Sequence, residues 1–95
     1  MHVVIRRYND NAKLMDVLEQ KHADVERLIR GVPGFVAYYL VRSTDGGASI
    51  SVYQDQAGTR ESTRLAGDWV RQNAPEAVGT PPEVTEGETI IQFGV

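Results

Sequence analysis

The stretch from residue 34 to residue 42, GFVAYYLVR, constrains the fold of this 95-residue chain more than any other part of it. It is rich in aromatic and β-branched residues and has glycine-containing turn signals on both sides, which is typical of a β-strand. Successive side chains on a strand point to opposite faces. Strict alternation places Phe35, Ala37, Tyr39 and Val41 on one face, and Val36, Tyr38 and Leu40 on the other. Both sets are apolar, so other parts of the fold have to cover both faces.

The remaining segments predict an α+β fold with the element order βαββαβ. Strands are expected at 3–8, 34–42 and 48–54. A fourth strand, interrupted at Gly87, is expected to be strongest at 89–93. Apolar residues at helical spacing predict one helix over 12–30 and a second from 56 to about 73. Right-handed connections then give a ferredoxin-like protomer: a four-stranded antiparallel sheet with two helices on one face. A chain of this length is expected to form a single domain, residues 1–95.

Helix start and stop signals support this division. The cluster Asn9-Asp10-Asn11 suits a turn and the N-cap of the first helix. For the second helix, Asp55 is the expected N-cap and Thr59 competes with it, because side chains of these types can accept hydrogen bonds from the first-turn amides. Gly31 is expected to end the first helix, and Asn73 with Pro75 the second. The sequence Asp45-Gly46-Gly47 predicts a hairpin between the second and third strands.

One copy of this fold would leave one face of the sheet uncovered. Two helices cover one face only, and the other face keeps several large apolar side chains. Leaving four or five of them in water forgoes roughly 6 to 15 kcal/mol, which is comparable with the stability of a whole domain. We therefore expect a homodimer with sheet packed against sheet, a dimeric α+β barrel. The alternative is that the C-terminal residues fold over this face or that it stays wet.

Composition excludes several classes of function. The net charge of −3 argues against nucleic-acid binding. The chain has no cysteine, which excludes disulfides and thiolate chemistry and fits a cytoplasmic location. No window is apolar enough to cross a membrane, and no histidine or carboxylate spacing predicts a metal site. We expect neither a metal nor another cofactor.

The order of several motifs resembles a known family. Val32-Pro33-Gly34-Phe35 opens the strand that carries Tyr38-Tyr39-Leu40, and Tyr53-Gln54-Asp55-Gln56-Ala57 leads from a strand into a helix. This pattern is similar to that of the antibiotic-biosynthesis-monooxygenase-type domains of the dimeric α+β barrel superfamily. The likeness covers about residues 3–73. It implies a ferredoxin-like protomer, a homodimer, and a family that includes cofactor-free oxygenases, haem-degrading enzymes and proteins with no assigned activity.

The resemblance also allows a comparison of site residues. In the haem-degrading branch, an Asn, a Trp and a His shape the site. Arg6 stands here at the Asn position and Ser62 at the Trp position, while Trp69 lies about two turns later. No histidine follows His22, so the axial ligand that haem requires is missing.

The polyketide oxygenases of the family orient a phenolic substrate with polar and aromatic side chains. By analogy, Arg6 would hold a substrate oxyanion and Tyr53 would transfer a proton. Tyr8, Ser51 and Trp69 are the expected ligand-binding residues. We expect Arg6, Ser51 and Tyr53 to share the barrel face if Ile50 and Val52 meet the helices.

Each candidate also has a structural interpretation. Trp69 has helical spacing with the core residues Leu65 and Ala66. Tyr38 and Tyr53 can serve as wall and interface residues. Arg6 can pair with a carboxylate across the dimer. His22 fits a half-exposed helix position.

Three functions remain open at this stage. The favoured one is a non-catalytic homodimer that binds a small molecule, with a small aromatic compound as the candidate ligand. The first alternative is a cofactor-independent monooxygenase acting on a phenolic or quinol-like compound. The second is a protein assembly module, because the two-faced second strand could pair at an edge.

Overall fold

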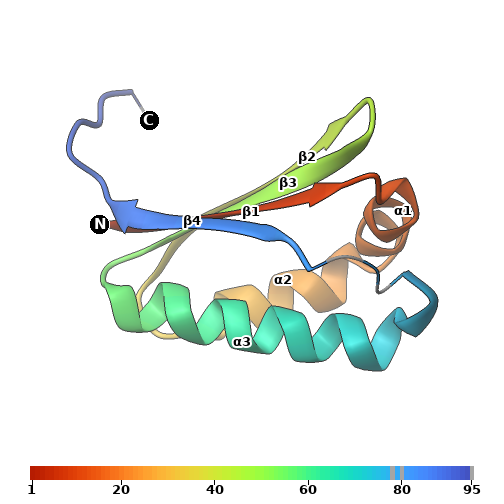
Figure 1. The fold of residues 1–95 in the computed structure, drawn as a ribbon. Coiled ribbons are helices and arrows are strands. Elements are labelled where there is room, and N and C mark those ends of the chain that lie inside the picture. Colours follow the sequence, from red (N-terminus) through yellow and green to blue (C-terminus); the bar gives the residue numbers. More distant parts are fainter. Residues whose placement is uncertain (78, 80, 95) are drawn as a thin grey trace.

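A computed structural model describes residues 1–77, 79 and 81–94 of the chain. It contains a four-stranded antiparallel sheet with strand order β2-β3-β1-β4. One layer of helices covers one face of the sheet, and the other face has no helix on it (Figure 1). The element bounds are β1 His2–Asn9, α1 Ala12–Gln20, α2 His22–Arg30, β2 Phe35–Ser43, β3 Gly46–Tyr53, α3 Gln56–Asn73, the 3-10 helix η1 Pro75–Ala77, and β4 Glu83–Glu88. The predicted ferredoxin-like α+β fold is therefore confirmed.

The expected N-caps are both present. The Asn11 side chain accepts a hydrogen bond from the Leu14 amide at 3.3 Å, and the Asp55 side chain accepts one from the Gly58 amide at 3.2 Å. Asn11 also donates to the Ala77 carbonyl at 2.9 Å, which ties the start of α1 to the segment after α3.

The first predicted helix is two helices. The chain leaves helical geometry at Lys21, which caps the end of α1 and the start of α2. No apolar side chain other than Ala23 lies between Leu18 and Val25, so nothing in this polar run holds a continuous helix onto the sheet. The break lets α1 pack on β3 while α2 packs against β2 and α3.

The prediction for the fourth strand was also wrong in position. β4 spans Glu83–Glu88 and pairs with β1 from His2 opposite Glu88 to Arg7 opposite Glu83. Thr89 donates one further hydrogen bond to the Met1 carbonyl at 2.8 Å. β1 starts at His2, so the apolar residues after Thr89 have no strand beside them despite their strong strand propensity.

A β-bulge changes the faces of β2. Phe35 lies opposite Tyr53 and Ala37 opposite Val52, so Val36 is an extra residue in this strand. Phe35 therefore packs against the core with Tyr38 and Leu40, and does not share the face of Tyr39 as strict alternation predicted. The Phe35 and Tyr53 rings form an edge-to-face pair with centroids 5.9 Å apart.

The polar side of β3 lies on the face of the sheet that the helices cover. The register places Val4, Arg6 and Tyr8 of β1 on the same face as Ser49, Ser51 and Tyr53 of β3. All six are buried, and this face carries the helices. The condition that Ile50 and Val52 meet the helices is not met, because both lie on the helix-free face. Arg6 and Ser51 are consequently inside the protomer and not on a face between two sheets.

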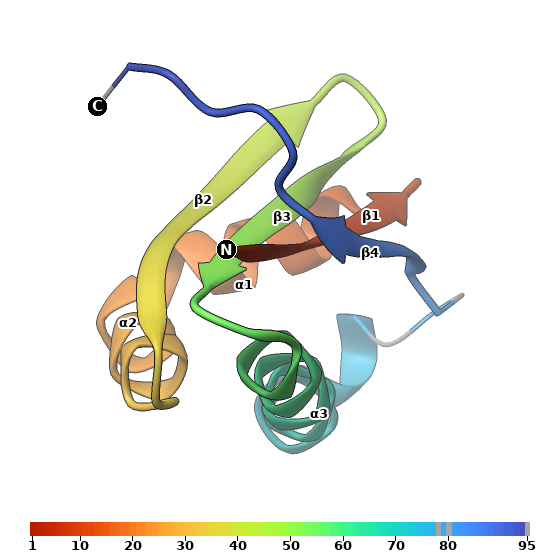
Figure 2. The same cartoon turned by 90° about the vertical axis from the view of Figure 1, so that its left-hand side faces the viewer.

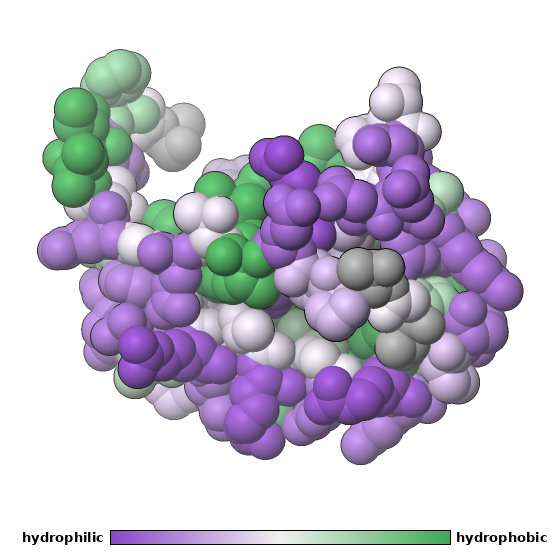
Figure 3. Space-filling view, in the orientation of Figure 1, coloured by the Kyte–Doolittle hydropathy of each residue, from purple (hydrophilic) through white to green (hydrophobic). Residues whose placement is uncertain are grey.

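The helix-free face is apolar over three strands. Its apolar residues include Val3, Ile5, Ala37, Tyr39, Val41, Ile50 and Val52, and the charged Arg7 lies on the same face. Tyr39 is 56% exposed and Val41 49% exposed. The C-terminal residues do not cover this face. They extend away from β4 on the side opposite the helices (Figures 1 and 2). The space-filling view shows apolar side chains both on this projecting segment and along the sheet (Figure 3).

Candidate functional site

A groove of about 730 Å³ lies between β2 and the helix pair α1 and α2. Its deep part is apolar and aromatic, and its rim is charged. The apolar lining includes Met15, Leu18, Val25, Ile29, Phe35, Tyr38 and Leu40, and the rim includes Glu19, His22, Glu26, Arg30 and Arg42. We refer to this space as the groove. Its volume falls within the range of known small-molecule pockets.

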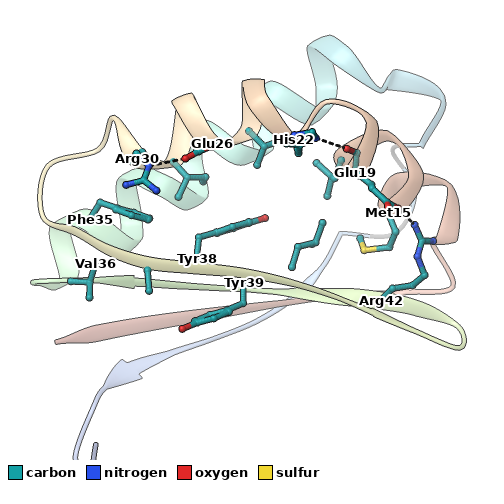
Figure 4. A pocket seen from close by; sticks show the side chains of 15 residues that line it. Met15, Glu19, His22, Glu26, Arg30, Phe35, Val36, Tyr38, Tyr39 and Arg42 are labelled. Atoms are coloured by element: carbon teal, nitrogen blue, oxygen red, sulfur yellow. Dashed lines mark hydrogen bonds and ion pairs between the residues drawn. The ribbon is translucent and has the colours of Figure 1, made fainter. Parts of the chain in front are cut away.

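Alternating residues of β2 divide between the groove and the helix-free face. Tyr38 points from β2 toward the helices, whereas Tyr39 lies on the other side of the strand (Figure 4). Burial raises the pKa of Tyr38 to about 12. The phenol of Tyr38 is therefore neutral at physiological pH and can act as a hydrogen-bond donor.

Ion pairs between oppositely charged side chains lie along the rim of the groove. Arg42 contacts Asp16 and Glu19, both at 3.0 Å, and Arg30 contacts Glu26 at 3.0 Å. The Arg30 guanidinium also lies over the Phe35 ring, 5.1 Å from its centroid. These exposed ion pairs contribute little stability, but they place positive and negative charges at the mouth of the groove.

Behind the groove lies a second, smaller space beside Arg6, of about 20 Å³. We refer to it as the Arg6 cavity. Leu18, Val25, Ile29 and Tyr38 line both spaces, so these four residues form the partition between them. The Arg6 cavity is otherwise lined by Arg6, Tyr8, Leu28, Ser49, Ala66, Trp69 and Val70.

Arg6 is only 2% exposed, and its polar contacts are all with hydroxyl groups. Its Nη2 donates to Ser51 Oγ at 3.0 Å and to Ser62 Oγ at 3.3 Å. Its Nε has no hydrogen-bond partner within the described residues, and neither has Ser49 Oγ. No carboxylate of the described chain pairs with Arg6. Because Arg6 is on the helix side, a second chain docked on the helix-free face would not bring a carboxylate to it.

The phenols near Arg6 are perturbed by burial. Burial raises the pKa of Tyr8, and the Arg6 charge and the Ser49 hydroxyl offset part of this rise. The same two groups act in the same direction on the pKa of Tyr38. Ser49 lies near both phenols, although its hydroxyl forms no hydrogen bond of normal geometry with either.

The structure brings most of the sequence-predicted site residues together. Arg6, Tyr8 and Trp69 all line the Arg6 cavity, and Ser51 holds the Arg6 side chain. Tyr53 lines neither the groove nor the cavity, and its hydroxyl donates to the Ile29 carbonyl at 2.7 Å. Burial raises the pKa of Tyr53 as well. The catalytic and binding roles of these five residues remain predictions.

Sequence reasoning did not find the groove or its rim. Tyr38 was interpreted as a wall and interface residue, Leu40 only as a strand residue, and Ser62 only as the substitute for a family Trp. A strand with large apolar side chains on both faces was the available signal, because the edge position of β2 leaves space beside Tyr38 that the helices do not fill.

Two kinds of feature are absent from the described residues: a metal-ligand cluster and a membrane-spanning helix. Its residues contain no cluster of three metal-ligating side chains. None of its described helices has the length and apolar character needed to cross a bilayer.

Comparison with known proteins identifies the fold. No family model matches the chain. No curated protein matches it either. Solved structures match over nearly the whole chain. A protein from Bordetella bronchiseptica classed as an antibiotic biosynthesis monooxygenase has a TM-score of 0.71 at 16% identity, covering 95% of this chain and 97% of that one.

Two other structural neighbours contain bound molecules. The heme-degrader MhuD from Mycobacterium tuberculosis, with two hemes in its active site, has a TM-score of 0.69 at 18% identity, covering 99% of this chain and 100% of that one. The ActVA-Orf6 monooxygenase of Streptomyces coelicolor in complex with Nanaomycin D has a TM-score of 0.62 at 21% identity, covering 99% and 89%. The chain therefore has the fold of the antibiotic-biosynthesis-monooxygenase-type domains that its sequence resembles.

Proposed function

We propose that this protein is a homodimeric, single-domain binder of a small, flat, largely apolar molecule, which it holds in the groove. The carrying observation is a space of about 730 Å³ with aromatic and aliphatic walls and charged groups only at its mouth. Such a lining takes an apolar ring system inside and leaves a polar substituent at the rim. Neighbours of the same fold bind ring compounds, which supports this ligand class. We further propose a cytoplasmic location, since a chain without cysteine fits a reducing compartment.

Titration with 1-naphthol, followed by intrinsic fluorescence, tests the groove. Leu40→Trp puts a larger side chain into the groove from β2 and should weaken binding about tenfold or more, or about 1.4 kcal/mol. Val84→Trp is the matched control, because Val84 lies on β4 and is 48% exposed outside the groove. Circular dichroism checks that both variants fold. Equal affinity of both variants and the parent would contradict the proposal.

The exposed apolar face supports the homodimer. Seven apolar side chains of β1, β2 and β3 lie on it, and the described C-terminal residues do not cover it. An uncovered apolar sheet face of this kind usually marks an interface. A second copy is the simplest partner, since the same face on both chains can pair around a two-fold axis.

A second candidate function is a cofactor-independent monooxygenase acting on a phenolic or quinol-like compound. The observation that favours it is the buried Arg6 cation, which has phenols beside it and no paired carboxylate in the described chain. Anthrone serves as the probe. Its ionised form reduces dioxygen, and its methylene carbon becomes a carbonyl while dioxygen supplies that oxygen and one molecule of water. Arg6 would stabilise the developing negative charge on the substrate oxygen.

Oxygen consumption with anthrone tests this candidate. Loss of an oxyanion donor commonly lowers turnover roughly 100-fold to 1000-fold, so Arg6→Met should lose activity on that scale. Tyr53→Phe should lower turnover if the hydroxyl handles a proton. Unchanged turnover would leave that hydroxyl with its structural bond to Ile29 only. Absence of oxygen consumption by the parent protein above the uncatalysed rate would reject the candidate for this probe.

Haem is not among the ligands that we propose. In the haem-degrading branch of the family, the axial histidine lies near the end of the second predicted helix. That helix corresponds to α3, which carries no histidine. His22 is at the exposed rim of the groove, where its Nδ1 contacts the Glu19 carbonyl at 3.1 Å, and His2 contacts Thr59 at 3.0 Å outside it.

A further inference from the structure

The interior of this protein contains a positive charge that the described chain does not neutralise. Arg6 is 2% exposed, and an arginine side chain stays protonated in proteins. Moving such a group out of water costs several kcal/mol unless a charged partner and hydrogen bonds compensate it. Ser51 and Ser62 supply two hydrogen bonds but no negative charge.

The Arg6 cavity presents donors and no anionic acceptor. Arg6 Nε is an unpartnered N–H donor, and the unpartnered Ser49 hydroxyl can rotate to donate as well. The neutral Tyr8 and Tyr38 phenols line the same cavity. Its remaining lining is apolar. About 20 Å³ of the Arg6 cavity is open to the centres of water-sized groups, so it can admit a small anion.

We propose that the Arg6 cavity is a binding site for one small anion, with chloride as the reference ligand. A water molecule would leave the Arg6 charge uncompensated, whereas a halide supplies a negative charge and accepts charge-assisted hydrogen bonds from the donors that line the cavity. This inference goes beyond the proposed function, because it needs no molecule in the groove.

A ligand in the groove is a second source of negative charge for this site. The partition formed by Leu18, Val25, Ile29 and Tyr38 separates the cavity from the groove. A deprotonated oxygen of a groove ligand that displaces this partition would reach the same donors. Competition distinguishes the sources: 1-naphthol displaces chloride only if its oxygen enters the cavity, and naphthalene has no oxygen to do so.

Chlorine NMR line width of the full chain in sodium chloride is the primary measurement. The parent protein should broaden the chloride signal saturably, and bromide should compete. Arg6→Met should abolish this broadening. Arg27→Met is the matched control, because Arg27 is exposed on α2 and pairs only with Asp24 in the described chain. Equal broadening by Arg6→Met and the parent would show an adventitious ion only and overturn the proposal.

Thermal unfolding gives an independent readout. Chloride should raise the Tm of the parent more than gluconate at matched ionic strength, because a ligand that binds only the native state stabilises it. Equal ionic strength removes general screening. Ser49→Ala keeps the cation and removes one donor, so it should weaken chloride binding several-fold even if Arg6→Met fails to fold.

A bromide-soaked crystal of the parent protein completes the test. Anomalous density inside the Arg6 cavity, beside the Arg6 guanidinium, is expected. Anomalous density only elsewhere on the protein would overturn the proposal. Naphthol binding in the groove is measured separately and without halide, so failure of one proposal leaves the other testable.

Discussion

Gly58 lies in the first turn of α3, directly against Tyr53. A Cβ at this position would come within 2.7 Å of the Tyr53 Cβ and ring. Gly58→Ala should therefore destabilise the protein by about 1 to 3 kcal/mol, because the buried Tyr53 has no room to move. Urea unfolding measures the change.

Gly67 provides the matched control on the same helix. Its added Cβ would meet only the flexible end of Arg71, at 3.5 Å. Gly67→Ala should stabilise the helix by about 0.5 to 1 kcal/mol, because glycine loses more backbone entropy than alanine on folding. Destabilisation of similar size by both substitutions would contradict the close packing at Gly58.

Tyr38 gives the protein a stability loss at alkaline pH. Its pKa rises from 10.0 to about 12 on folding. The unfolded chain then releases the proton first, so stability is full below about pH 10 and falls by about 1.4 kcal/mol per pH unit until about pH 12. Tyr38→Phe should remove up to about 3 kcal/mol of this loss in urea unfolding across that range.

Tyr39→Phe is the control for this pH dependence in protein diluted below the dimer dissociation constant. Tyr39 is the next residue on β2, and in the single chain it is 56% exposed on the helix-free face. Under that condition its substitution should leave the alkaline slope unchanged. An unaltered slope in Tyr38→Phe would place the responsible group elsewhere, for example at Tyr8 or Tyr53, whose pKa values burial also raises.

At the scale of elements, Asn11 connects two parts of the fold. Its side chain caps α1 and donates to the Ala77 carbonyl in η1. Asn11→Asp keeps the cap acceptor and removes the donor, whereas Asn11→Ala removes both. We expect a loss of about 1 kcal/mol for Asp and about 2 kcal/mol for Ala, measured by thermal unfolding. Equal losses for the two substitutions would show that the bond to Ala77 contributes nothing.

Sequence patterns predicted the elements whose signals are local. The caps at Asn11 and Asp55, the hairpin at Asp45 and the end of α3 at Asn73 all depend on neighbouring residues, and all were confirmed. The β4 position, the bulge at Val36 and the break at Lys21 depend on which strand or helix lies alongside. Alternation along one strand cannot reveal an extra residue, and strand propensity at 89–93 cannot create a partner strand.

The candidate site was predicted only in part for a related reason. Parity correctly grouped Arg6 with Tyr8, and Ser51 with Tyr53, on shared faces. Which face meets the helices depends on the assembled sheet, and the polar residues of β3 proved to be the buried ones. The groove was not predicted, because it is a space between elements, and the apolar side chains on both faces of β2 do not show which space the helices leave unfilled.

At the scale of the whole molecule, the apolar helix-free face predicts self-association. Sedimentation at micromolar concentration should show two chains per particle. Tyr39→Asp places a charge on this exposed face and should weaken association by about 2 kcal/mol or more, roughly thirtyfold. Val84→Asp, which is exposed on the other side of the sheet, should leave the assembly unchanged. A single-chain particle for the parent protein would contradict the dimer.

Neighbouring side chains of β2 face opposite sides of the strand: Tyr38 points to the groove and Tyr39 to the other side (Figure 4). A ligand that displaces the Tyr38 ring also shifts the peptide unit between Tyr38 and Tyr39. Occupancy and self-association are then thermodynamically linked, and the linkage is reciprocal. Dilution of the protein should therefore change its measured affinity for naphthol, and saturating naphthol should change its dimer dissociation constant by the same factor.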